Sequence, residues 1–201
     1  MKKVGVLVSG RGSNLQALVD AARRGELGGE VAVVVSNVED APGLDRARQA
    51  GIPAVFRDHR GMKREAFDAE VVEVLRAHGV DLVCLAGFMR LLSPVFVRAF
   101  PGRILNIHPA LLPAFPGLDA QHRALEHGVK VSGATVHLVD EGLDSGPIVA
   151  QEAVPVRSTD TPETLAARIL EAEHRLYPRA VRLLLEGRCR VEGRRVIVEG
   201  E

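Results

Sequence analysis

The chain has 201 residues, of which 26 are Lys or Arg and 26 are Asp or Glu, so its formal net charge at pH 7 is zero. Without net positive charge there is no general field to attract nucleic acid or an anionic membrane surface, and any bound anion must be held locally. Aromatic residues make up only 3% of the chain, with six Phe, one Tyr and no Trp. That is too few for the stacking surfaces that bind single-stranded nucleic acid. We therefore expect small-molecule substrates, with no nucleic acid and no membrane as partners.

The amino terminus resembles a signal peptide only over its first residues. A basic pair precedes the apolar run from Val4 to Val8, but Gly-Arg-Gly follows within ten residues, and no apolar stretch of about 18 residues occurs. The spacing of Cys84 and Cys189 fits neither a CxxC motif nor a zinc site, which predicts reduced thiols. We expect a cytoplasmic protein.

Short apolar runs alternate with helical patterns, which predicts a doubly wound α/β fold with a mainly parallel sheet and helices on both faces. In chain order, the patterns up to residue 100 predict strands over 4–8, 31–35, 53–56 and 80–86, with helices over 15–22, 42–51, 63–78 and 94–100.

The remaining half predicts mixed strands at the carboxyl-terminal end. A strand over 103–108 precedes a helix over 119–128 that Asp119 can cap, a half-exposed strand over 130–139 and a strand over 147–156. A long helix is then expected from Asp160 to about Glu186, kinked at Pro178, before a hairpin over 189–198. No linker or repeat interrupts the chain, so we expect one domain.

The loop from Ser9 to Asn14 follows the first strand and opens a helix, where free backbone N–H groups and the helix dipole favour an anion. It lacks the third glycine of a dinucleotide fingerprint, because Leu15 stands there, and no Gly-Lys-Ser/Thr makes it a P-loop. The loop is therefore either a cradle for one phosphate, made by Gly12, Ser13 and Asn14, or an ordinary tight turn.

Asn106 and His108 lie two residues apart in a predicted strand, so their side chains share one face. They stand at the carboxyl end of that strand, where ligands usually bind in an open α/β sheet. A lone histidine there is more often a hydrogen-bonded structural residue, but with the amide on the same face a ligand site becomes an equal alternative.

An acidic loop follows at 140–147, with the carboxylates Asp140, Glu141 and Asp144. It is either a solvated turn or the source of one carboxylate that orients His108 and raises its pKa, so that the ring can act as a general acid near neutral pH. The sequence leaves open which of the three does so. A metal site built from His108, His137 and Asp144 is a further alternative, although no HExxH or comparable spacing supports it.

Four motifs stand out when these segments are taken together: Ser9-Gly10-x-Gly12-Ser13-Asn14-Leu15-Gln16-Ala17, Ala86-Gly87-Phe88-Met89-Arg90-Leu91-Leu92, Asn106-Ile107-His108-Pro109-x-Leu111-Leu112-Pro113 and Leu143-Asp144-x-Gly146-Pro147. In this order and spacing they resemble the phosphoribosylglycinamide formyltransferase family, and the resemblance covers roughly residues 3–186. Methionyl-tRNA formyltransferase and formyltetrahydrofolate deformylase share the Asn-x-His and Asp elements. Those relatives carry an additional domain that 201 residues would not accommodate.

The resemblance implies transfer of the formyl group of 10-formyltetrahydrofolate, as co-substrate, to the amine of 5-phosphoribosylglycinamide in de novo purine biosynthesis, without a metal. It implies a Rossmann-like formyltransferase domain over 1–201, with a phosphate-binding half over about 1–100, a catalytic and folate half over about 101–188 and the hairpin 189–198. A monomer or homodimer is expected. A formyltetrahydrofolate hydrolase and a non-catalytic nucleotide-sensing module remain the alternatives.

The resemblance also implies roles for individual residues. Asn106, His108 and Asp144 would be catalytic, with Asp144 as the partner of His108. Relatives commonly have histidine in place of Asp119, so Asp119 and the nearby His122 are left out of the site. The substrate would be bound by Gly12, Ser13, Asn14 and Glu173, and the folate by Arg64, Met89, Arg90, Leu91, Leu92 and Asn106.

Overall fold

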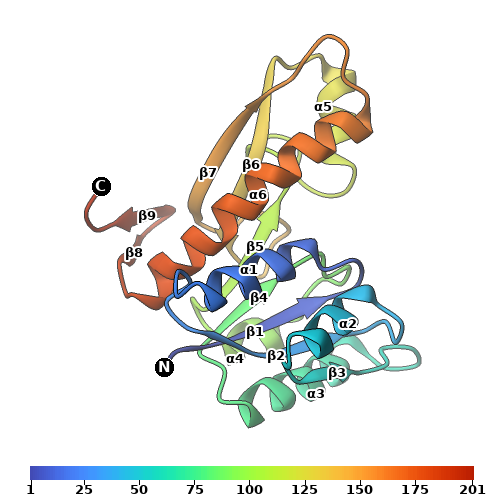
Figure 1. Cartoon of the computed structure of the whole chain (residues 1–201), viewed down its shortest axis with the longest axis vertical. Helices are drawn as coiled ribbons and strands as arrows, with labels where there is room; N and C mark the ends of the chain where they lie inside the picture. Colours follow the sequence, from blue (N-terminus) through green and yellow to red (C-terminus); the bar gives the residue numbers. More distant parts are fainter.

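The computed structural model describes residues 1–201, and its strands form one nine-stranded sheet in the order β3-β2-β1-β4-β5-β6-β7-β9-β8 (Figure 1). The first five strands of this order are mutually parallel: β3 (Ala54–Phe56), β2 (Glu30–Ser36), β1 (Lys3–Val8), β4 (Leu82–Leu85) and β5 (Ile104–His108). The antiparallel strands β6 (Val131–Leu138) and β7 (Ile148–Pro155) extend the sheet from β5. The terminal hairpin of β8 (Cys189–Glu192) and β9 (Arg195–Val198) joins β7 through a single parallel pair, Ile148 with Arg195.

Helices cover both faces of this sheet, as its apolar strands require. On one face α1 (Ser13–Arg23), α2 (Pro42–Gln49), α5 (Ala120–His127) and α6 (Pro162–Leu185) share a cluster of 30 buried residues with the strands. On the other face α3 (Arg64–Ala77) and α4 (Pro94–Ala99) close a cluster of 14. The predicted fold class, a mainly parallel sheet with helices on both faces and mixed carboxyl-terminal strands, is confirmed. None of the helices combines the length and the apolar composition needed to cross a membrane.

Every predicted element is present, with bounds within about two residues, but β6 is more buried than its alternating sequence predicts. It is buried from Ser132 to Leu138, not half-exposed. The helix α6 packs against it, and the segment that follows β5 covers it as well, because Thr135 Oγ1 donates to the Ala110 carbonyl at 2.7 Å and accepts from Leu112 N at 3.1 Å.

Helix starts differ from the expected caps. Asp119 occupies the N-cap position of α5, but its backbone is left-handed, with φ 54°, and its side chain makes no capping hydrogen bond. A side-chain cap occurs instead at α6, where Thr161 and Thr164 form a reciprocal capping box. The helix α6 continues through the buried Pro178.

Gly12 is the residue at which the loop after β1 turns into α1, and only glycine suits its surroundings. Its φ is 71°, and an added Cβ would lie 2.8 Å from the Cα atom of Gly43 on α2. The same loop is held to α2 by two hydrogen bonds, from Gly43 N to the Gly10 carbonyl at 3.0 Å and from Arg46 Nε to the Arg11 carbonyl at 2.7 Å. The loop therefore rests directly on the start of α2.

The substitution Gly12→Ala should destabilise the protein more than Gly25→Ala. Both residues have a left-handed backbone, which costs about 1–2 kcal/mol for alanine, but a Cβ at Gly25 would meet no atom within 4 Å. The contact with Gly43 should add about 1–3 kcal/mol at Gly12. Urea denaturation of both variants measures the two free energies of unfolding. Equal losses would show that the loop does not pack on α2 as described.

Candidate active site

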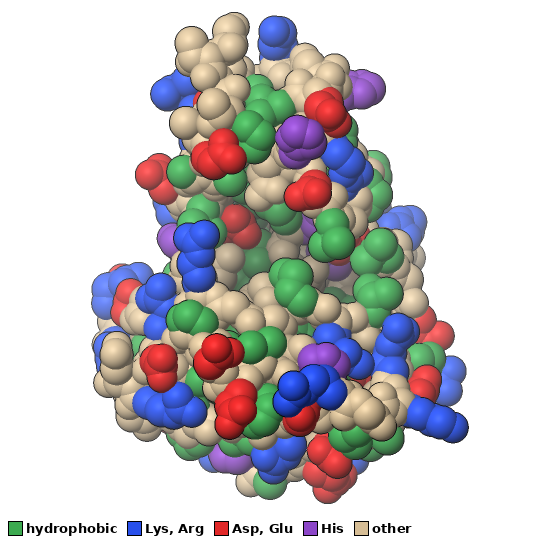
Figure 2. All heavy atoms as spheres, turned by 90° about the vertical axis from the view of Figure 1, so that its right-hand side faces the viewer, with side chains coloured by type: hydrophobic (Ala, Val, Ile, Leu, Met, Phe, Trp, Pro, Cys, Tyr) green, Lys and Arg blue, Asp and Glu red, His purple; other side chains and the backbone are tan.

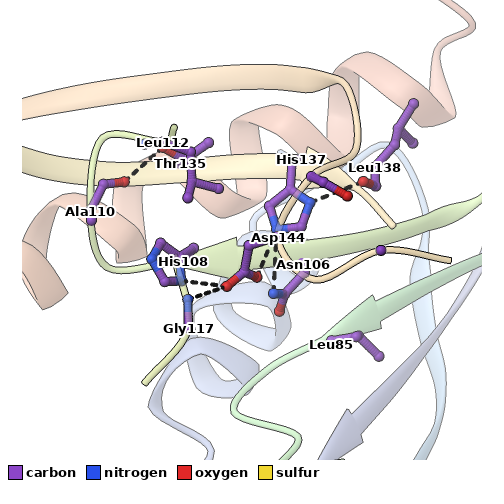
Figure 3. Close-up of polar contacts among 12 residues, drawn as sticks. Leu85, Asn106, His108, Ala110, Leu112, Gly117, Thr135, His137, Leu138 and Asp144 are labelled. Carbon is purple, nitrogen blue, oxygen red and sulfur yellow. Dashed lines mark hydrogen bonds and ion pairs between the residues drawn. The ribbon is translucent and has the colours of Figure 1, made fainter. Parts of the chain in front are cut away.

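The strand β5 carries Asn106 and His108 at the place where the sheet changes from parallel to antiparallel pairing. Asp144 comes from the loop between β6 and β7, and its carboxylate points toward both residues (Figure 3). His108 Nδ1 is 3.4 Å from Asp144 Oδ2. Of the three carboxylates in the acidic loop, Asp144 is therefore the one beside His108, whereas Asp140 binds within its own loop, to Gly142 N and Ser145, and Glu141 pairs with Arg98.

Asp144 is held as an anion although its side chain is only 8% exposed. Burial alone would raise its pKa, but the adjacent His137 ring, a hydrogen bond from the Gly117 amide and the proximity of His108 hold the pKa below its ordinary value. Gly117 N donates to Oδ2 at 2.8 Å. The residue also has a left-handed backbone, with φ 48°, a conformation that non-glycine residues adopt mainly where the surroundings enforce it.

His108 does not have the raised pKa that its pairing with a carboxylate predicts. Burial lowers its pKa below the ordinary value of 6.5, and the Phe115 carbonyl and Asp144 offset this only in part. The expectation that pairing raises the pKa of His108, so that the ring is a general acid near neutral pH, is therefore wrong. Nε2 donates to the Phe115 carbonyl at 2.7 Å, and Nδ1 faces Asp144. Both ring nitrogens thus face an oxygen acceptor, so a proton taken up by the ring would be stabilised at once.

His137 is a fourth member of this group that the sequence analysis considered only as a metal ligand. It pairs directly with Asn106 across β5 and β6. Its Nδ1 donates to the Leu138 carbonyl at 2.9 Å, so in the neutral ring Nε2 carries a lone pair and can accept from Asn106 Nδ2 at 3.4 Å. His137 therefore orients the Asn106 amide. The alternating pattern over 130–139 places His137 in a strand, but only the register between β5 and β6 shows that Asn106 is its partner.

The three side chains considered as a metal site, His108, His137 and Asp144, do lie together. His137 Nε2 is 3.5 Å from Asp144 Oδ1. The ring nitrogens lie 3.4 and 3.5 Å from the Asp144 oxygens, however, and the structure contains no group of three or more His, Cys, Asp or Glu side chains placed to hold a metal ion. The arrangement of this group suits proton transfer and hydrogen bonding to a developing negative charge.

The loop from Ser9 to Asn14 opens α1 without a side-chain cap, so the first backbone N–H groups of the helix are free for an anion. Asn14 lies in the first turn and donates through Nδ2 to Glu173 Oε1 of α6 at 3.3 Å, while its own Oδ1 is buried without a partner. Burial raises the pKa of Glu173 to about 7. Gly12, Ser13, Asn14 and Glu173 thus lie in one neighbourhood, which no hydrogen bond or ion pair joins to the group around Asp144.

The residues expected at the folate site follow β4 or begin α3. The Arg90 guanidinium lies over the Phe67 ring of α3, 5.0 Å from its centroid, and Arg64 is one turn earlier on that helix. Met89 and Leu91 are 68% and 53% exposed, which is high for large apolar side chains. On the face of the molecule toward which β1 points, Figure 2 shows a hollow at mid-height with hydrophobic side chains around it.

A family model described as formyl transferase matches residues 2–181. The chain is 43% identical over 197 residues to phosphoribosylglycinamide formyltransferase of Escherichia coli (strain K12), and the match covers 98% of this chain and 93% of that protein. The crystal structure of glycinamide ribonucleotide transformylase 1 from Symbiobacterium toebii is 59% identical, with a TM-score of 0.97 over 98% of this chain and 94% of that one.

Two further relatives are longer than this chain. A formyltetrahydrofolate deformylase from Pseudomonas syringae pv. tomato is 33% identical, with a TM-score of 0.90, over 98% of this chain and 66% of that one. The trifunctional purine biosynthetic protein adenosine-3 of Drosophila melanogaster is 52% identical over 189 residues, and the chain spans only 14% of its length. Because the family model and the Escherichia coli protein both match most of the sequence, the chain belongs to the formyl transferase family.

Proposed function

We propose that this protein transfers the formyl group of 10-formyltetrahydrofolate to the amine of 5-phosphoribosylglycinamide, giving 5-phosphoribosyl-N-formylglycinamide and tetrahydrofolate in de novo purine biosynthesis. The observation that carries the proposal is the convergence of Asn106, His108 and Asp144, with His108 and Asp144 3.4 Å apart. The similarity to phosphoribosylglycinamide formyltransferases along nearly the whole chain supports the choice of substrates.

The reaction is an acyl transfer that needs no protein nucleophile. The substrate amine attacks the formyl carbon, and the carbonyl oxygen becomes an oxyanion in a tetrahedral intermediate. Asn106 has one amide hydrogen directed at His137, which leaves the other to donate to the oxyanion. The pair formed by His108 Nδ1 and Asp144 Oδ2, which lie 3.4 Å apart, takes the proton from the attacking nitrogen and passes it to the departing N10 of the folate. Asp144 stabilises the ring while it carries that proton.

The substrate is held at two further places. Its phosphate binds the free N–H groups at Gly12, Ser13 and Asn14, and Glu173 contacts the phosphoribosyl group. The folate lies along Met89, Arg90, Leu91 and Leu92 and reaches Asn106, with the cation of Arg64 near its glutamyl carboxylate. The division of the domain near residue 100, an assembly as monomer or homodimer and a cytoplasmic location stay predictions.

A formyltetrahydrofolate hydrolase is the second candidate, favoured by the similarity to a solved deformylase. It would use the same Asn-His-Asp group with water in place of the amine, and it would have no use for the uncapped start of α1. A nucleotide-sensing module would leave the convergence of Asn106, His108 and Asp144 without a role.

Mixing the protein with 10-formyltetrahydrofolate and 5-phosphoribosylglycinamide should give deformylation only when both compounds are present. The absorbance change that accompanies loss of the formyl group measures it directly. Deformylation at the same rate without the amine would identify a hydrolase, and binding of the phosphorylated compound without deformylation would identify a sensing module.

Asn106→Ala and His108→Ala should each lower kcat by about 10² to 10³, the usual cost of removing a preorganised donor or proton carrier. His78→Ala is the matched control, because His78 ends α3 before β4 begins, at the opposite edge of the parallel sheet from the site. Circular dichroism checks that each variant is folded. Turnover near the wild-type value in either variant would contradict the assignment.

Glu173→Gln should stabilise the protein more at pH 8 than at pH 5. Burial raises the folded-state pKa of Glu173 from 4.5 to about 7, so stability is lost as the pH rises between these values and the unfolded state ionises first. The gain over wild type should be larger at pH 8 by about 2 kcal/mol, measured by urea denaturation at both pH values. Glu171→Gln, at an exposed position on the same helix, is the control. An equal gain at both pH values would show that Glu173 ionises normally.

A further inference from the structure

The Ser9 hydroxyl links two loops that bind different substrates in the proposed function. One is the loop from Ser9 to Asn14, and the other is the segment that begins at Met89. Ser9 begins the first of these loops, directly after β1. Its Oγ accepts a hydrogen bond from the backbone N of Met89 at 2.9 Å, and Met89 begins the segment expected to hold the folate. The Ser9 backbone N donates to the Gly87 carbonyl at 3.2 Å, so the two loops are also joined through their main chains.

The same hydroxyl continues the connection in the other direction. Ser9 Oγ donates to Asn37 Oδ1 at 2.6 Å, and Asn37, which is 7% exposed, follows β2. Asn37 Nδ2 lies 3.3 Å from Nδ1 of His59, which follows β3. A chain of polar groups therefore crosses the carboxyl ends of four neighbouring strands, β3, β2, β1 and β4.

This arrangement fixes the direction of each hydrogen bond. The hydroxyl has one hydrogen, which the Asn37 oxygen accepts, and its lone pair receives the Met89 N–H. Asn37 can thus hold the hydroxyl in the rotamer that accepts from Met89. A ligand that orders either loop also orders the partner of the shared hydroxyl, which lowers the entropic cost of ordering the other loop.

We propose that Ser9 is a positioning residue that couples phosphoribosyl-substrate binding to folate binding, through its hydrogen bonds to Met89 N and Asn37 Oδ1. The inference rests on the proposed function, because it assigns the two loops to those ligands. The Ser9 hydroxyl has no hydrogen bond to Asn106, His108 or Asp144. Binding is reciprocal, so each ligand tightens the other by the same factor. A neutral hydrogen bond changes an equilibrium constant by about two- to tenfold, which sets the expected size of the coupling.

Isothermal titration calorimetry with 5-phosphoribosylglycinamide and tetrahydrofolate measures this coupling without turnover, since tetrahydrofolate carries no formyl group. The Kd of each ligand is determined alone and with the other at saturation. In the wild-type protein each ligand should tighten the other about two- to tenfold. In Ser9→Ala this factor should fall to near one. In Asn37→Ala, which retains the Ser9 hydroxyl but frees its rotamer, the factor should be intermediate.

Ser132→Ala is the matched control, because Ser132 is a buried serine on β6 whose Oγ has no hydrogen-bond partner. It should keep the wild-type factor. Thermal unfolding checks the fold of each variant, and Asn37→Ala decides the outcome if Ser9→Ala does not fold. An unchanged factor in the variants, or no coupling in the wild type although both ligands bind, would overturn the inference and leave the proposed function intact. Failure of the wild type to bind either ligand would overturn both.

Discussion

The ionised carboxylate of Asp144 is the charge on which the arrangement of the candidate site depends. A buried anion is stable only among polar groups, and here a backbone amide donates to it while two imidazole rings lie 3.4 and 3.5 Å away. Each ring is in turn fixed by the backbone: His108 by the Phe115 carbonyl and His137 by the Leu138 carbonyl. The left-handed backbone at Asp144 directs its carboxylate toward β5. Orientation of the Asn106 amide then follows, because its partner His137 is already held in place.

The change of strand direction at β5 explains how these donors meet. After α5 the chain returns as β6, which runs antiparallel to β5 and sets His137 opposite Asn106. The loop between β6 and β7 then brings Asp144 back to the same edge. The parallel strands contribute the loops and helix starts that follow their carboxyl ends. Here these are the uncapped start of α1, after β1, and the segment after β4. The parallel half of the sheet thus provides backbone groups and loops at this edge, and the antiparallel half provides the His137 and Asp144 side chains.

Apolar periodicity predicted the strands and helices correctly because most helices bury one face and most central strands bury both. Each kind of burial leaves a regular apolar pattern in the sequence. Alternation and strand position predicted that Asn106 and His108 share one face, and the glycines of the loop from Ser9 to Asn14 predicted an anion cradle or a tight turn. Three predictions were wrong because they depended on tertiary neighbours. These were the half-exposure of β6, the capping of α5 by the Asp119 side chain and the raised pKa of His108. The choice of Asp144 and of the residues expected to bind the folate came from the family resemblance, since spacing alone does not determine which loops meet. The contact of Asn106 with His137 required the strand register.

The raised pKa of Glu173 has a consequence for how the protein exchanges protons with its surroundings. Near pH 7 its carboxyl group is divided between a protonated form, which can donate a hydrogen bond, and an ionised form, which can only accept. A sugar hydroxyl can satisfy either form, but burial of a ligand against Glu173 removes more water and favours the neutral acid. If Glu173 contacts the phosphoribosyl substrate as proposed, association is accompanied by proton uptake from the buffer, and its observed enthalpy includes the ionisation enthalpy of that buffer. The binding step itself, and not only the chemical step, is thereby linked to pH.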